Sequence, residues 1–364
     1  MWTYHNPVNI QAAPGALARL PGLLAGRDCI LVTFPEAHGL GLVERMQALL
    51  GAQLRGVISA ILPNPDVQWL APLYDQVQRD HGDVPCVVAL GGGSVIDSAK
   101  ALLCATPSGR FAELLAVLEQ GGELPAGAHK ALIAIPTTAG TGSEVTPWAT
   151  LWDQAGGRKH SLHQRWTWPE AALIDADLMR SLPAGATLAS GLDALSHALE
   201  SLWNVNRNPV SSQLAVGAAR RILRTLPALM QDLGHAGLRA EMAEAALLAG
   251  LAFSNTKTAL AHSISYEMTL RHGLPHGIAC SFTLPLVLGL AWGQDAERDR
   301  TLQRVFGSEL NQAQAWLRTF LHSLSVKTEF ADYGVSAEQA QTLLNDAIKG
   351  ARGQNFIGSA SALR

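Results

Sequence analysis

The feature that most constrains the fold of this chain is an apolar run, residues 86–90, that leads directly into the glycine turn Gly91-Gly-Gly-Ser94. The residues after the turn, 95–104, have helical periodicity. A strand, a glycine turn and a helix in this order place backbone N–H groups and a helix N-terminus against a phosphate. Glycine allows an approach that a side chain would block, and Ser94 is a suitable N-cap. The segment predicts a phosphate-binding α/β unit, although an isolated turn of this kind can also be purely structural.

The pattern of predicted elements changes near residue 180. Before it, strand-like runs alternate with helical stretches; the strands are expected at 29–33, 57–62, 86–90 and 131–135, and helices at 40–50 and 67–81. That alternation is typical of a parallel sheet covered by helices. Beyond residue 183 the pattern is helical, as at 214–232, 238–251 and 311–324. We therefore expect an α/β domain over 1–180 and an all-helical domain over 181–364.

Composition is consistent with a two-domain soluble enzyme. The 364 residues are 48% hydrophobic and 16% charged, which favours a well-buried globular chain. A net charge of −3 gives no indication of nucleic-acid binding, and no stretch has the length and apolarity of a membrane span. The N-terminus lacks the pattern of a secretory signal, and the four cysteines have neither disulfide-framework nor zinc-type spacing. We expect a cytoplasmic protein with buried free thiols.

Four potential metal ligands lie in the second half of the chain. Asp193 and His197 are four residues apart, so on a helix they share one face. His262 and His276 follow further along the chain. Three neutral imidazoles and one carboxylate suit zinc or ferrous iron and leave a position open for substrate. The alternative is that these are scattered polar residues on helix faces.

Several longer motifs follow one another in a fixed order. They are the segments 91–100, 135–146 and 191–200, then His262, and then Pro275-His276-Gly277. In this order they resemble the iron-containing, group III alcohol dehydrogenase family over nearly the whole chain. The resemblance implies a dehydroquinate synthase-like fold, with a dinucleotide-binding domain at 1–180, a helical metal-binding and substrate domain at 181–364, and an active site in the cleft.

The resemblance also implies the chemistry. Members transfer a hydride between NAD or NADP and a small alcohol or aldehyde, which needs close approach and orientation of the two. One divalent metal, Fe²⁺ or Zn²⁺, would be bound by Asp193, His197, His262 and His276 and would stabilise negative charge on the substrate oxygen. Nothing in this set of ligands selects iron over zinc. The expected assembly is a homodimer or a larger homo-oligomer.

Cofactor contacts carried over from the family motifs fall on positions throughout the first domain. They are Phe34, Asn64, Gly92, Gly93, Ser94, Asp97, Thr137, Thr138, Thr146, Lys159 and Leu178. Gly92, Gly93 and Ser94 would bind the pyrophosphate, and Lys159 would contact a ribose; alternatively Lys159 is a solvated surface lysine.

Phe34 departs from the family pattern. Many members carry at this position an aspartate that binds the ribose hydroxyls of the adenosine. Without that carboxylate a ribose 2′-phosphate is repelled less, so NADPH becomes usable beside NADH. Phe34 could instead simply pack under the adenine.

The position four residues after His262 departs as well. Many members have a proton-relay histidine there, and this chain has Tyr266. A phenol has an unperturbed pKa of about 10, so Tyr266 could relay a proton only if the site perturbs it. His272 is the alternative relay, and it can equally be a surface or capping residue.

The substrate prediction concerns Lys257, which precedes the segment 258–266. That segment resembles the phosphonoacetaldehyde reductase branch of the family. If the segment is helical, Lys257 lies about a turn and a half before His262 and can bind an anionic tail; it can also merely cap a helix or pair with an acid. Weaker candidates for the same task are Arg165, Arg207 and Arg271.

We therefore expect a small aldehyde with an anionic group, with phosphonoacetaldehyde first and plain aliphatic alcohols as the alternative. A second class of function is a metal- and NAD-dependent lyase related to dehydroquinate synthase. The Asp/His pattern disfavours it, because those synthases usually place a glutamate at the position of Asp193. A non-catalytic descendant would usually have lost a ligand, and none is missing here.

Overall fold

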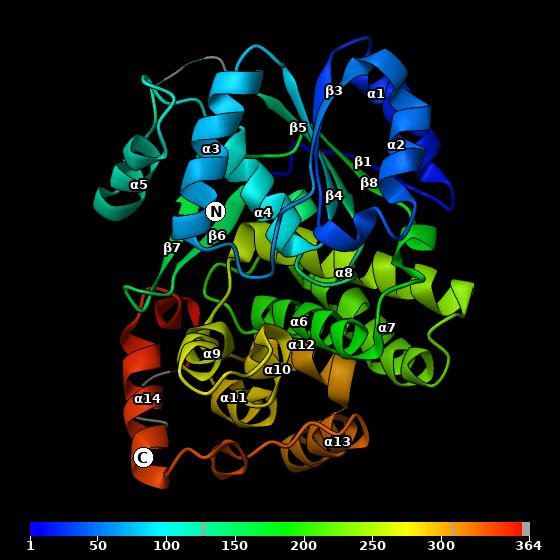
Figure 1. The fold of residues 1–364 in the computed structure, drawn as a ribbon. Helices are drawn as coiled ribbons and strands as arrows, with labels where there is room; N and C mark the ends of the chain where they lie inside the picture. Colours follow the sequence, from blue (N-terminus) through cyan, green and yellow to red (C-terminus); the bar gives the residue numbers. More distant parts are fainter. Residues whose placement is uncertain (126, 128, 308, 359–364) are drawn as a thin grey trace. The chain divides into compact units, whose positions relative to one another are not determined.

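A computed structural model describes the chain except residues 126, 128, 308 and 359–364. The chain forms two compact units (Figure 1). The α/β unit comprises Pro7–Thr138 and Ser143–Met179, and the helical unit comprises Met1–Asn6, Ala139–Gly142 and Arg180–Arg364. Two short segments, one at the N-terminus and one that interrupts the α/β unit, thus belong to the helical unit.

The α/β unit is built on a six-stranded sheet in the order β1-β8-β5-β4-β2-β3, and all its strand pairs are parallel. The strands are β1 (Asn9–Ala12), β2 (Cys29–Val32), β3 (Leu54–Ile58), β4 (Cys86–Gly91), β5 (Ala131–Pro136) and β8 (Ala171–Ile174). Strands β6 (Trp148–Asp153) and β7 (Arg158–His163) form a separate antiparallel pair. The predicted fold class, a parallel α/β domain followed by a helical domain, is confirmed.

Helices cover both faces of this sheet, because its central strands are apolar on both sides. In β4, Val87 and Ala89 join one buried cluster, while Val88 and Leu90 join the other. This alternation is what a strand buried on both faces requires. The covering helices are α1 (Leu20–Leu24), α2 (Leu42–Leu50), α3 (Val67–His81), α4 (Gly93–Leu102) and α5 (Phe111–Gln120). Helices α1 and α2 pack in one cluster and α3, α4 and α5 in the other.

The helical unit has a single large apolar core. Its helices are α6 (Ala184–Leu202), α7 (Pro209–Gln231), α8 (Ala236–Thr256), α9 (Leu260–Leu270), α10 (His276–Ser281), α11 (Leu284–Ala291), α12 (Ala296–Phe306), α13 (Leu310–Ser323) and α14 (Ala337–Lys349). Short 3-10 helices are η1 (Ala16–Arg19), η2 (Pro35–Ala37), η3 (Gly51–Gln53), η4 (Ser143–Val145), η5 (Ala176–Met179), η6 (Phe330–Tyr333) and η7 (Gly353–Asn355). No helix in the described part of the chain is long and apolar enough to cross a membrane.

Local signals explain where some of these helices begin. Asn208 caps α7 by accepting from the Ser211 N–H, and the Ser211 hydroxyl accepts from the Asn208 N–H, while Pro209 occupies the first helical position. This reciprocal cap satisfies two backbone donors that the helix itself leaves unpaired.

Helix α6 lies at the centre of the helical unit, and Gly191–Leu202 is buried throughout. Two glycines allow close packing around it. A Cβ on Gly191 would meet the side chain of Leu226 in α7, and one on Gly277 in α10 would overlap the carbonyl oxygen of Ala189 in α6. The backbone of α10 therefore approaches α6 at a distance that only glycine permits.

We expect Gly277→Ala to destabilise the protein by about 3 kcal/mol, because the backbone of α6 cannot yield as a flexible side chain would. Gly185→Ala is the matched control, since Gly185 is also in a helix of this unit and has open space around it. It should leave stability unchanged or raise it by up to about 1 kcal/mol. Denaturant unfolding of both variants at one metal concentration measures the difference. Equal stabilities would contradict this account of the α6–α10 contact.

Candidate active site and metal centre

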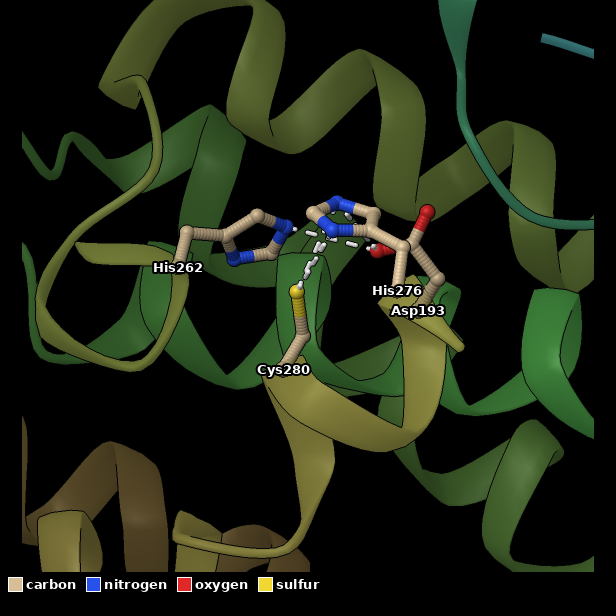
Figure 2. Close-up of side chains that lie close together, drawn as sticks. All are labelled: Asp193, His262, His276 and Cys280. Carbon is tan, nitrogen blue, oxygen red and sulfur yellow. Dashed lines mark hydrogen bonds and ion pairs between the residues drawn. The ribbon is translucent and has the colours of Figure 1, made fainter. Parts of the chain in front are cut away.

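The four predicted metal ligands converge in the helical unit. Asp193 and His197 lie one turn apart in α6, His262 lies in α9 and His276 begins α10. Asp193 Oδ1 is 3.3 Å from His262 Nε2, 3.8 Å from His197 Nε2 and 3.9 Å from His276 Nε2. Figure 2 shows three of these side chains pointing toward one another. Three helices thus bring one carboxylate and three imidazoles to a common point.

These atoms lack the partners that buried polar groups normally have. Asp193 and His262 are each 4% exposed, and neither Asp193 Oδ1 nor His262 Nε2 has a hydrogen-bond partner. Leaving such groups unsatisfied costs about 1–3 kcal/mol each. A divalent cation would satisfy both, and one oxygen with three imidazole nitrogens suits zinc or ferrous iron. The residues present therefore fit a metal.

Electrostatics keep Asp193 and His197 in the protonation states that bind metal. Burial would raise the pKa of Asp193, but charge on His197, His276 and His262 holds it well below its usual range. Burial lowers the pKa of His197 to about 4, with the Asp193 carboxylate opposing the shift. At neutral pH an ionised carboxylate thus faces a neutral imidazole on the same helix.

Cys280 is a fifth potential donor, which the sequence analysis classed only as a buried thiol. It lies one turn after His276 in α10, with its Sγ 3.5 Å from His276 Nε2 (Figure 2). One ligand atom from each of Asp193, His262, His276 and Cys280 lies within 4.8 Å of the others. The i, i+4 spacing of His276 and Cys280 is the signal in the sequence that could have indicated this.

Glu200 contacts the ring nitrogen of His262 that faces away from Asp193, and the sequence motifs did not indicate it as a functional residue. This fully buried carboxylate lies 2.7 Å from His262 Nδ1 and accepts the backbone N–H groups of Ala259 and His262. A carboxylate with a lowered pKa can only accept, so His262 Nδ1 carries the proton and Nε2 faces Asp193. Burial would raise the pKa of Glu200, and the charge of His262 together with the hydrogen bonds from His262 and Ala259 outweighs that effect. Glu200 lies seven residues after Asp193, on the same face of α6.

In the α/β unit, several predicted cofactor residues follow strands of the parallel sheet. Phe34 follows β2, Gly92 follows β4, Thr137 and Thr138 follow β5, and Leu178 comes after β8. Because carboxyl ends of parallel strands meet at one edge, these residues share the edge at which such sheets bind nucleotides. Asn64, in the loop after β3, is tied to this edge by a hydrogen bond from its N–H to Ser94 Oγ.

The glycine turn has the geometry expected of a phosphate-binding loop, with one correction. Helix α4 begins at Gly93, and its N-cap is Gly92, which has no side chain to cap with. The prediction that Ser94 is the N-cap is wrong, since its hydroxyl accepts from Asn64 instead. A Cβ on Gly92 would lie 3.1 Å from Thr138 Cγ2, so glycine keeps the helix N-terminus uncovered at this point.

Asp97 holds the cofactor edge together through protein contacts. It is half-buried in α4, and its two oxygens accept from Ser143 Oγ at 2.5 Å and from the Thr150 N–H at 2.8 Å. Lys100 donates to Ser143 O and to Trp148 O, both at 2.7 Å. Both carboxylate oxygens thus already have protein donors, and the segment that contains buried Thr146 is fixed by them. Direct contact between Asp97 and the cofactor remains a prediction.

Lys159 lies in β7, where its amino group is 5.4 Å from the ring centroid of Trp152. The two residues are paired across β6 and β7. A lysine over an aromatic face is held electrostatically without losing its charge. The ribose contact assigned to Lys159 by resemblance remains a prediction.

Nearly the whole chain matches the sequence models of one enzyme family. Residues 7–176 match the model described as iron-containing alcohol dehydrogenase. Residues 187–360 match the model of the Fe-containing alcohol dehydrogenase family, C-terminal. The chain belongs to the iron-containing alcohol dehydrogenase family. This confirms the resemblance inferred from the order of the motifs.

Individual members of this family show the same likeness. The chain is 38% identical over 205 residues to a probable alcohol dehydrogenase, EutG, of Escherichia coli, covering 56% of this chain and 50% of EutG. It is 36% identical over 224 residues to a phosphonoacetaldehyde reductase of Streptomyces viridochromogenes, covering 60% and 56%. These matches span about half the length of either relative. The crystal structure of sulfoacetaldehyde reductase from Bifidobacterium kashiwanohense in complex with NAD⁺ superposes with a TM-score of 0.88 at 28% identity, covering 100% of this chain and 96% of that one.

Tyr266 lies in α9 one turn after His262. Burial raises the pKa of Tyr266 to about 12, against the opposing charges of Arg352 and His262. The hydroxyl therefore stays protonated at neutral pH and can donate a hydrogen bond more readily than it can accept a proton. His272, the alternative relay, is half-buried in the turn between α9 and α10. Both relay roles remain predictions.

Lys257 does not lie on a helix that continues to His262, so that premise is wrong. Helix α8 ends at Thr256, Lys257 is its C-cap, and α9 begins at Leu260. The backbone of Lys257 has φ 66° and ψ 173°, a conformation that favours glycine. Its N–H donates to Phe253 O, and its carbonyl accepts from Asn204 Nδ2. The backbone of Lys257 acts as a cap, and helical geometry does not place its amino group beside the metal site.

The weaker cation candidates have local partners. Arg207 pairs with Glu297 at 2.7 Å and Arg271 with Glu267 at 2.8 Å. The guanidinium of Arg165, in the α/β unit, lies over Trp166 at 5.4 Å. The two paired arginines are therefore compensated by neighbouring carboxylates.

We expect Glu200→Gln to weaken zinc affinity by about 10- to 100-fold, because the neutral amide orients His262 less firmly and makes its ring less basic. Competition with a chromophoric chelator measures the affinity, and circular dichroism checks that the variant is folded. Glu267→Gln, the same substitution in α9, is the control and should leave the affinity unchanged. If the two variants bind zinc equally well, Glu200 does not support the metal centre.

Proposed function

We propose that this protein is a metal-dependent, NAD(P)-linked alcohol dehydrogenase or aldehyde reductase. The observation that carries the proposal is the convergence of Asp193, His197, His262 and His276, with two of the donor atoms left unsatisfied in a buried site. Family membership and the glycine turn at the edge of the parallel sheet support it.

The chain's own residues would act in three ways. Asp193 and the three histidines would hold Fe²⁺ or Zn²⁺, with Cys280 beside them. A bound divalent metal supplies Lewis-acid stabilisation of negative charge on the substrate oxygen. Glu200 orients His262, and the N–H groups at the start of α4 would bind the pyrophosphate of NAD or NADP. Tyr266 would hold its proton near the substrate oxygen, with His272 the second candidate.

The substrate proposed is a small aldehyde that carries an anionic group. Two of the similar proteins are reductases of phosphonoacetaldehyde and sulfoacetaldehyde, which are both two-carbon aldehydes with an acid group. Plain aliphatic alcohols are the alternative, because EutG is a probable alcohol dehydrogenase.

Three further parts of the proposal concern the protein as a whole. The domains are a dinucleotide-binding domain at 1–180 and a metal-binding and substrate domain at 181–364. The assembly is a homodimer or a larger homo-oligomer. The location is the cytoplasm, which is supported by four buried free cysteines.

The metal requirement is the direct test of the activity. We expect one divalent metal per chain, and His276→Ala should lose metal and aldehyde-dependent NAD(P)H oxidation together, because a ligand is removed. Elemental analysis and an absorbance assay on the same preparation measure both. His38→Ala, an exposed histidine of the α/β unit, is the control and should retain both. Full activity in a verified metal-free preparation would contradict the mechanism.

Cofactor choice is tested at Phe34, which is half-buried two residues after the end of β2. We expect Phe34→Asp to reduce kcat/KM for NADPH more than for NADH by about tenfold, because a carboxylate there repels a 2′-phosphate. Phe34→Asn is the matched control, since it removes the ring without adding charge. This role of Phe34 is contradicted if the native enzyme rejects NADPH completely. It is also contradicted if Phe34→Asp and Phe34→Asn change the ratio of kcat/KM for NADPH to that for NADH equally.

A further inference from the structure

An arginine that no sequence motif indicated lies against the segment that carries a metal ligand. Arg352 is in the turn between α14 and η7. Its guanidinium carbon lies 4.8 Å from the ring centroid of Tyr266, and its Nε donates to Thr258 Oγ1 at 3.1 Å. Thr258 and Tyr266 lie four residues before and after His262. Arg352 therefore bridges the two ends of the stretch that presents His262.

The charge of Arg352 has no counterion among the residues that the structure describes. In the described part of the chain, no carboxylate lies within ion-pair distance of its guanidinium, whereas Arg207 and Arg271 each have one at less than 3 Å. A guanidinium has five N–H donors, and within the described part of the chain only the Nε donor of Arg352 bonds a side chain. Stacking on an aromatic ring occupies the face of the group and leaves its edge available. That edge is suited to bidentate binding of a phosphonate, sulfonate or carboxylate.

The turn that carries Arg352 is fixed to the start of α9 by other contacts. Asn355 Nδ2 donates to Thr258 O at 2.8 Å, and the Asn355 N–H donates to Arg352 O at 3.0 Å. Ser263 Oγ donates to Ala347 O in α14 at 2.8 Å. A cation held in this way loses little freedom when it binds an anion, which improves affinity.

We propose that Arg352 is the specificity-determining residue that recognises the anionic group of the substrate. This inference rests on the proposed function. Tyr266 lies four residues after His262, and four residues of helix rise about 6 Å. Because residues four apart share one face of a helix, the guanidinium beside Tyr266 lies along the face of α9 that carries the metal ligand His262. Arg352 is the better candidate than Lys257, because its guanidinium contacts Tyr266 and Thr258 on either side of the metal ligand His262.

The test compares the metal-loaded wild-type enzyme with Arg352→Gln on phosphonoacetaldehyde, sulfoacetaldehyde and propanal. We expect wild type to prefer the anionic aldehydes, and Arg352→Gln to lower kcat/KM for them by about 30-fold or more, mainly through KM. Its kcat/KM for propanal should change by less than about threefold. Arg271→Gln removes the same charge from an ion-paired arginine nearby and should leave the preference intact. Lys257→Gln should do so as well.

A binding measurement tests the inference without turnover. Methylphosphonate should raise the melting temperature of wild type and of Arg271→Gln, and should not raise that of Arg352→Gln. Equal losses on propanal and the anionic aldehydes, together with a lowered melting temperature, would show that Arg352 is structural. Loss of anion preference in Lys257→Gln alone would also overturn the inference.

If metal-loaded wild type reduces no aldehyde with either cofactor, the proposed function fails, and the methylphosphonate shift still decides the role of Arg352. If wild type reduces propanal as well as it reduces the anionic aldehydes, the inference fails and the proposed function stands.

Discussion

The helical unit is organised around one buried carboxylate. Burial by itself would favour the protonated form of Asp193, and its ionised form is maintained by imidazoles from α6, α9 and α10. Three helices must therefore present these rings to one oxygen, and the close packing of α10 on α6 at Gly277 follows from that need. In natural proteins, buried polar atoms without a hydrogen-bond partner occur mainly at functional sites. The unsatisfied atoms of Asp193 and His262 are such a departure.

A second layer of contacts determines where His262 points. Glu200 accepts from its ring and from two backbone N–H groups at the start of α9. Just before α9 the chain passes through the left-handed conformation of Lys257, whose carbonyl is held by Asn204. Asn355 holds the carbonyl of Thr258 from the C-terminal side. The loop is thus anchored by several elements, and this anchoring keeps a strained backbone in place beside a metal ligand.

The α/β unit shows the same division between residues that face a ligand and residues that support them. The glycine turn exposes backbone N–H groups at the start of α4, as a phosphate requires. Asp97 and Lys100, which lie on the same helix, are turned inward and bond Ser143, Trp148 and Thr150. A motif of ten residues therefore contains both the expected binding surface and the buried network that supports it.

The sequence by itself determined the class of the fold, the order of its two parts and four candidate metal ligands. Strand and helix periods, the glycine turn and the i, i+4 pair Asp193/His197 are local properties, so they can be read along the chain. Tertiary structure alone decided the rest. Glu200 and Arg352 contact neighbours that are distant in sequence, and no local pattern encodes such contacts. The same limit explains two errors. Ser94 and Lys257 were assigned from local helix rules, but each accepts a long-range hydrogen bond, Ser94 Oγ from the Asn64 N–H and the Lys257 carbonyl from Asn204 Nδ2.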